Sequence, residues 1–159
     1  MATLIGVISD THDLLRAEAV EALRGVDLII HAGDIDTPEV IAALQELAPV
    51  TAVRGNCDRG DWAKAYPLWQ RVTVAEVAIF VLHDRKDLPM LMPANESGVQ
   101  VVISGHSHKP AMEEKDGVLY LNPGSAGRKR FKLPVTLALL KVVGVRVSAQ
   151  IVELLPELH

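Results

Sequence analysis

Cysteine and aromatic residues are scarce in this chain of 159 residues, which has one cysteine, Cys57, and an aromatic content of 4%. A single cysteine excludes an intramolecular disulfide. So few aromatic side chains argue against a surface on which the bases of single-stranded nucleic acid stack. Val, Leu, Ile and Ala must therefore fill most of the hydrophobic core.

The chain also lacks a long apolar run and a strong excess of either charge. No apolar run approaches the roughly 20 residues of a transmembrane helix, so we expect no membrane association. The formal net charge is only -4, and Lys and Arg are dispersed except at residues 128–132, which argues against dedicated nucleic-acid binding. Because an apolar segment begins almost at Met1, we expect no signal peptide and a cytoplasmic location.

The length and the hydrophobic content of 49% predict one domain spanning residues 1–159. In the first half, short apolar runs alternate with two helices. The first helix is expected over Leu14–Arg24, and the second has Thr37 as its N-cap, begins at Pro38 and is ended by Pro49. The crossover rule makes the strands on either side of these helices parallel neighbours.

The second half is rich in strands. Gly144 predicts a hairpin near the end, and residues 88–92 can form about one helical turn between prolines. Strand-like segments lie at residues 70–75, 77–82, 99–104, 118–121, 134–142 and 145–153. The whole pattern is typical of an α/β protein with two sheets, partly parallel and partly antiparallel, and with helices outside.

Polar motifs recur directly after five of the apolar runs. They are Asp10-Thr11-His12, Gly33-Asp34, Gly55-Asn56-Cys57-Asp58, His83 and Gly105-His106-Ser107-His108. Continuous apolar runs indicate strands buried on both faces, and open α/β sheets bind ligands beyond the carboxyl ends of such strands. Mixed oxygen and nitrogen ligands suit two divalent ions, among which Mn, Fe, Zn, Co and Ni all tolerate this set. The motifs therefore predict a metal site.

Each candidate ligand also has a purely structural explanation. Asp10 could cap a helix, Asp34 could occupy a turn, and Asn56 could adopt the left-handed conformation after a glycine. His83 could be a hydrogen-bonded core histidine. Taken singly these explanations suffice, but their joint occurrence in this order favours metal binding.

Two neighbouring cations repel each other and need an anionic group between them. Asp34 follows the second strand, near the middle of the predicted sheet, and is the natural bridge. His106 and His108 are separated by one residue on an extended segment and so point the same way. One of these two imidazoles can serve each ion.

The ordered series Asp-x-His, Gly-Asp, Gly-Asn-x-Asp, His and Gly-His-x-His resembles the calcineurin-like metallophosphoesterase superfamily. It is most similar to the small bacterial and archaeal phosphodiesterases, whose fold is also that of a retromer scaffold subunit. The resemblance implies a four-layer α-β-β-α sandwich of two mixed sheets flanked by helices. The implied ligands are Asp10, His12 and His108 for one ion and Asn56, His83 and His106 for the other, with Asp34 bridging. It further implies that a metal-bridging hydroxide attacks phosphorus, with Asp34, Asn56 and His106 as catalytic residues.

The sequence departs from the superfamily pattern at Cys57 and at the pair Asp84-Arg85. Cys57 stands where many larger members have a histidine that acts on the leaving group, and it either contacts the substrate or is a buried small hydrophobe. Asp84 and Arg85 follow His83, where the family usually has a glycine and often another histidine.

Three arginines are candidates for binding the phosphate of the substrate, because guanidinium matches phosphate geometry. They are Arg85, Arg128 and Arg130, and a solvated surface arginine is the alternative for each. His31 lies within its strand rather than beyond it, so we expect a core histidine there and not a ligand.

The sequence thus predicts a binuclear metal-dependent phosphoesterase acting on a small phosphoester, with phosphodiesters and manganese favoured. Phosphomonoesterase activity is an alternative, because the same hydroxide can attack either ester. A non-catalytic interaction scaffold of the same fold is the other alternative, although a scaffold has no reason to retain a complete ligand set. A homo-oligomer is compatible with the sequence.

Overall fold

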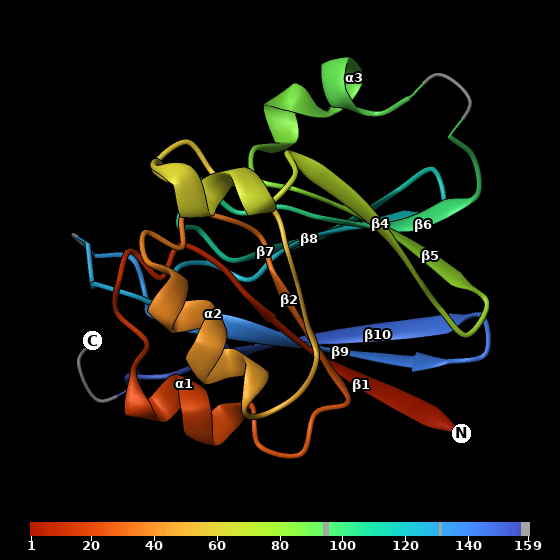
Figure 1. Ribbon diagram of the computed structural model, residues 1–159. Coiled ribbons are helices and arrows are strands. Elements are labelled where there is room, and N and C mark those ends of the chain that lie inside the picture. Colours follow the sequence, from red (N-terminus) through yellow and green to blue (C-terminus); the bar gives the residue numbers. More distant parts are fainter. Residues whose placement is uncertain (94–95, 131, 157–159) are drawn as a thin grey trace.

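The computed structural model describes residues 1–93, 96–130 and 132–156, whose strands form two sheets (Figure 1). The strands of the first sheet are β1 (Ala2–Ile8), β2 (Leu28–His31), β3 (Val50–Ala52), β9 (Thr136–Val143) and β10 (Arg146–Glu153). Those of the second are β4 (Trp69–Val74), β5 (Val77–Leu82), β6 (Val99–Ile103), β7 (Ala111–Lys115) and β8 (Val118–Asn122).

Both sheets are mixed. The first has the strand order β10-β9-β1-β2-β3, with β1, β2 and β3 parallel and β9 antiparallel to both β1 and β10. The second has the order β4-β5-β6-β8-β7, with β5, β6 and β8 parallel and the two edge strands antiparallel. The prediction of an α/β sandwich with two mixed sheets is confirmed.

Apolar side chains fill three successive layers. Strand β5 shows the arrangement, because alternate residues face opposite sides. Val77, Ile79 and Val81 join the cluster between the two sheets, whereas Phe80 and Leu82 join a cluster on the outer face of the second sheet. Both faces of this strand are therefore buried, which explains why its sequence is continuously apolar.

Helices cover the outer faces of the sheets (Figure 1). In the described part of the chain, three helices pack on the first sheet: α1 (Ala17–Ala22), α2 (Pro38–Gln45) and the 3-10 helix η1 (Asp61–Ala65). On the second sheet packs α3 (Leu88–Leu91), which directly follows the 3-10 helix η2 (Arg85–Asp87). Thr37 caps α2 as predicted, since its hydroxyl accepts a hydrogen bond from the Glu39 N–H. Within the described residues, no helix combines the length and the apolar character needed to cross a membrane.

Two sequence expectations need correction. The helix expected over 14–24 is only six residues long, because the chain before it turns tightly at Thr11, whose carbonyl accepts a hydrogen bond from the Leu14 N–H at 3.0 Å. Strand β7 was not expected, since its residues are all exposed and show no apolar alternation. The Asp116-Gly117 pair, with both residues at positive φ, closes the hairpin between β7 and β8 and is the signal that indicates it.

Candidate metal centre

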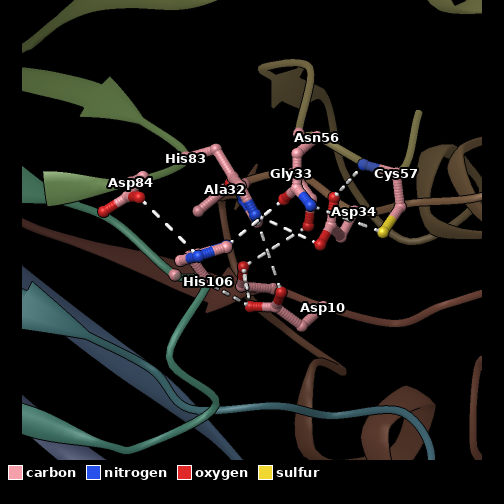
Figure 2. A network of polar contacts seen from close by, with 12 residues as sticks. Asp10, Ala32, Gly33, Asp34, Asn56, Cys57, His83, Asp84 and His106 are labelled. Atoms are coloured by element: carbon pink, nitrogen blue, oxygen red, sulfur yellow. Dashed lines mark hydrogen bonds and ion pairs between the residues drawn. The ribbon is translucent and has the colours of Figure 1, made fainter. Parts of the chain in front are cut away.

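The seven predicted ligands gather where the carboxyl ends of parallel strands from both sheets meet. The first sheet supplies Asp10, His12, Asp34 and Asn56, and the second supplies His83, His106 and His108. Figure 2 shows five of them around a common centre, namely Asp10, Asp34, Asn56, His83 and His106. The backbone N–H of His106 donates to Asp10 Oδ2 at 3.0 Å, and this bond joins the two sheets at the centre.

The ligand atoms fall into two clusters, in each of which they lie within 4.8 Å of one another. One cluster contains Asp10, His12 and His108, and the other contains Asp34, His83 and His106. Asn56 adjoins the second cluster, because its Oδ1 lies 3.2 Å from His106 Nδ1. The division matches the two ligand groups that the sequence resemblance implies.

Asp34 lies between the two clusters. Its Oδ2 is 3.6 Å from His12 Nε2 in one cluster and 3.2 Å from His83 Nε2 in the other. Its Oδ1 accepts a hydrogen bond from the Cys57 N–H at 2.8 Å, which fixes the carboxylate in this orientation. The position is the one that a bridging carboxylate requires.

The chemistry of the donor atoms fits divalent cations. Asp10 Oδ1 and His83 Nε2 are buried and, within the described part of the chain, have no hydrogen-bond partner. Asp10 Oδ1 is nevertheless approached by the Nε2 atoms of His108 at 3.4 Å and His12 at 3.8 Å. A buried carboxylate oxygen among imidazole nitrogens, with no donor hydrogen directed at it, is a costly arrangement that a cation would stabilise.

Two of the histidines are oriented by hydrogen bonds on the ring nitrogen that faces away from the centre. His83 Nδ1 contacts the Ala32 carbonyl at 2.7 Å, and His12 Nδ1 contacts Asp36 Oδ2 at 3.2 Å. Such partners keep the proton on Nδ1 and leave Nε2 free to bind a metal. Asp36 was missed by sequence reasoning, although the Gly-Asp-x-Asp spacing could have indicated it.

Asp58 is a second residue whose role the sequence did not reveal. Its buried carboxylate accepts hydrogen bonds from the backbone N–H groups of Asp34, Ile35, Asp36 and Gly55 at 2.8–3.0 Å. It therefore holds the loop that follows β2 against the loop that follows β3. Burial raises the pKa of this carboxyl, and the negative charge of Asp34 adds to the rise, although the donated hydrogen bonds oppose it.

We expect Asp58→Asn to lower the free energy of unfolding of metal-free protein by about 2–4 kcal/mol. The NH₂ group of asparagine cannot accept hydrogen bonds, so the two backbone N–H groups that face it lose their acceptor. These two N–H groups stay buried without a partner, which is costly. Urea unfolding of chelator-treated protein measures the change. Asp61→Asn is the matched control, because the Asp61 side chain is fully exposed in η1. Equal stability of the two variants would contradict this role.

Asp34 and His83 perturb each other's ionisation. Burial raises the pKa of Asp34, but the close contact and charge of His83, the Cys57 N–H and the charge of His12 outweigh it and hold that pKa well below its usual range. Burial lowers the pKa of His83, but Asp34 and Asp10 outweigh it and raise that pKa to about 9. The carboxylates thus stabilise a positive charge at this point of the fold.

His31 is fully buried and acts as a core histidine, as expected. Its Nδ1 accepts the Gly33 N–H at 3.0 Å, and its Nε2 lies 3.1 Å from the Thr11 hydroxyl, which reaches the Ile35 carbonyl. Burial lowers the pKa of His31 to about 4, so the ring stays neutral at physiological pH. It connects the loops that follow β1 and β2 without contributing a ligand.

The backbone at the centre is unusual. Five of the predicted ligands, Asp10, His12, Asp34, His106 and His108, have positive φ angles of 44–71°, so the expectation of an extended segment at His106 and His108 is wrong. Each such conformation costs on the order of 1 kcal/mol or more for a residue with a side chain. Glycines permit the close approach, since a Cβ on Gly55 would lie 2.2 Å from Asp34 Oδ1 and one on Gly105 would lie 2.6 Å from Asp10 Oδ2.

The predicted substrate-binding residues lie around the centre with partners of their own. The Cys57 thiol is exposed, so its alternative interpretation as a buried hydrophobe is wrong. Partial desolvation by its neighbours, together with the charge of Asp34, raises the pKa of the thiol. Arg128 pairs with Asp13 at 3.0 Å, both side chains being exposed. Arg85 pairs with Glu113 at 3.4 Å. Their roles in binding phosphate stay predictions.

The calcineurin-like phosphoesterase superfamily domain matches residues 3–144 of the chain. The chain belongs to this superfamily. It is 38% identical to a probable metallophosphoesterase of Methanothermobacter thermautotrophicus, over 94% of this chain and 91% of the relative. The resemblance in the sequence is thereby confirmed, and the protein is a phosphoesterase at the level of its family.

Solved structures with similar folds include an archaeal phosphodiesterase and Vps29 from Entamoeba histolytica in complex with Zn²⁺. The phosphodiesterase has a TM-score of 0.76 at 27% identity and covers 94% of this chain and 100% of its own. Vps29 has a TM-score of 0.73 at 22% identity and covers 96% of this chain and 99% of its own, a likeness that concerns the fold.

Proposed function

We propose that the protein hydrolyses phosphodiesters at a centre of two divalent metal ions. The observation that supports this most strongly is the position of Asp34, whose Oδ2 lies within 3.6 Å of imidazole nitrogens from both clusters. A carboxylate shared in this way is what two neighbouring cations need. When bound, such ions supply Lewis acidity, which activates water as a nucleophile and neutralises charge on the phosphoryl oxygens.

The residues of the chain would divide the work. Asp10, His12 and His108 would hold one ion, and Asn56, His83 and His106 the other, with Asp34 bridging. Asn56 and His106 are exposed, whereas His83 and Asp10 are buried. The substrate would therefore approach from the side of Asn56 and His106, and the buried ligands would exclude bulk water from the opposite side.

Phosphodiesters are favoured over monoesters because the superfamily relatives of similar length include proteins named as phosphodiesterases. Manganese is our first choice of metal, with Fe, Zn, Co and Ni compatible with the same ligands. The scaffold alternative is motivated by the likeness of the fold to Vps29. The complete ligand set argues for hydrolysis.

The test compares bis(4-nitrophenyl) phosphate with 4-nitrophenyl phosphate, using protein stripped by a chelator and then supplied with Mn²⁺. We expect no hydrolysis by the stripped protein, recovery with Mn²⁺, and a higher kcat/KM for the diester. Activity that survives chelation would overturn the metal-dependent mechanism. Tight Mn²⁺ binding without hydrolysis of either ester would favour the scaffold.

A further inference from the structure

A cavity of about 560 Å³ is lined by His106 and by none of the buried predicted ligands. Its volume lies within the range of small-molecule sites, about 300–1,000 Å³. The charged residues that line it are Asp84, Arg85, Lys86, Lys109 and Glu113. Three positive and two negative side chains thus surround a space next to a proposed metal ligand.

Arg85 and Glu113 neutralise each other in the wall of this cavity. The Arg85 guanidinium lies 4.0 Å above the centre of the Tyr120 ring, and its two terminal nitrogens lie 3.4 Å and 3.5 Å from the Glu113 carboxylate. A guanidinium that is stacked on one side and paired along its edge already has part of its binding capacity occupied. The arginine therefore has two partners of its own in the wall of the cavity.

Asp84 is also engaged. Its Oδ1 accepts a hydrogen bond from the Lys86 backbone N–H at 3.1 Å, and its Oδ2 lies 3.7 Å from His106 Nε2, a contact that Figure 2 shows. Both carboxylates of the cavity thus have partners other than lysine ammonium groups. Within the described residues, the ammonium groups of Lys86 and Lys109 have no ion pair or hydrogen bond.

Two uncompensated lysines in one cavity are notable because the whole chain is acidic, with a formal net charge of -4. We propose that the cavity binds a second phosphate group of the substrate, carried on one of its alcohol arms, through Lys86 and Lys109. The inference rests on the proposed function, since it places the scissile ester at the neighbouring metal centre. It narrows the substrate to phosphoesters that bear an additional terminal phosphate.

The charge of the ligand supports this choice. A terminal phosphate carries a charge of about -1.5 to -2 at pH 7, whereas a diester carries only one negative charge. A compact ammonium group on a flexible stem is suited to a dianion whose position it can follow. A substrate with two uncharged arms would leave both lysines without a partner.

The test uses two esters that share the same reacting bond and the same chromogenic leaving group. They are thymidine 5′-(4-nitrophenyl phosphate) and its 3′-phosphorylated form, assayed with Mn²⁺-loaded protein. We expect kcat/KM to be about tenfold higher for the phosphorylated ester, mainly through KM. In the double variant Lys86→Gln/Lys109→Gln, the ratio of the two kcat/KM values should fall to near 1.

Lys115→Gln is the matched control, because Lys115 lies on β7, the strand that carries Glu113, but does not line the cavity, and it should keep the ratio. Equal kcat/KM values for the two esters in the unsubstituted protein would overturn the inference and leave the proposed function standing.

If neither ester is hydrolysed, the phosphate site can still be tested separately from the hydrolase function. Calorimetry would then compare the affinities of the protein for thymidine 3′,5′-bisphosphate and thymidine 5′-monophosphate. Tighter binding of the bisphosphate, lost in the double variant, would support the phosphate site while the hydrolase function fails. Equal binding of the two nucleotides would overturn the site as well.

Discussion

Replacing Asp34 with asparagine is expected to reduce Mn²⁺-dependent phosphoester hydrolysis by three to four orders of magnitude. The free energy of binding at a structural zinc site is about 10–16 kcal/mol. Divided among four ligands, this is roughly 3 kcal/mol per ligand, which corresponds to about 100-fold in metal affinity. Asp34 contacts both clusters, so its replacement should weaken metal binding at both. The fold should survive, because the oxygen of asparagine can still accept the hydrogen bond of the Cys57 N–H.

Hydrolysis rates at a Mn²⁺ concentration that just saturates the unsubstituted protein, and circular dichroism of the same samples, provide the measurement. Asp116→Asn is the matched control, since Asp116 also has a positive φ, 53° against 57° for Asp34, but lies in the hairpin between β7 and β8. That variant should retain full activity. A folded Asp34→Asn protein with more than about a tenth of normal activity would contradict the bridging role, because the loss of a single metal ligand should already cost about 100-fold.

Loading with Mn²⁺ is expected to raise the thermal midpoint of the protein by about 10–20 °C relative to chelator-treated protein. At free metal near 100 times Kd, each site adds about 2.7 kcal/mol, and each kcal/mol shifts the midpoint by about 2–4 °C in a domain of this size. The buried Asp10 oxygen without a hydrogen-bond partner is the physical source of the gain. Binding removes the cost of leaving that acceptor unsatisfied.

Thermal unfolding monitored by circular dichroism, with chelator and then with increasing Mn²⁺, measures this shift. The control is Asp34→Asn, in which the shift should fall to less than half because both sites lose a ligand. The midpoint of that variant with chelator should be lower than that of the unsubstituted protein, because the charge pair of Asp34 with His83 is lost, so the shift is compared within each variant. Identical midpoints with and without Mn²⁺ would show that the two clusters bind no ion.

Much of the fold could be predicted because strands with both faces buried are continuously apolar. The run from Val77 to Leu82 shows this clearly, since its alternate residues enter two different cores. Strand β7 gave no such signal, because its residues are exposed at a sheet edge and only backbone pairing with β8 defines it. The contact between Arg85 and Glu113 was hidden for the same reason, as Glu113 lies on β7.

The candidate ligands could be predicted because parallel strands of one sheet end at a common edge, so a polar residue after each strand marks that edge. The supporting residues could not. Asp58 and Asp36 act through contacts with loops more than 20 residues away, and those contacts depend on the left-handed turns at Asp10, His12 and Asp34. Loop conformation of this kind leaves no periodic pattern in a sequence.

The predicted ligands come from loops of two separate sheets, which elsewhere meet mainly through a layer of apolar side chains. Apolar packing resists separation but has little directional preference, so by itself it tolerates small sliding movements. A pair of ions bound by residues of both sheets would cross-link the two halves of the sandwich. Amide hydrogen exchange should therefore slow on metal binding at the ends of β1, β2, β5 and β6 together, and far less at the opposite end of the same strands.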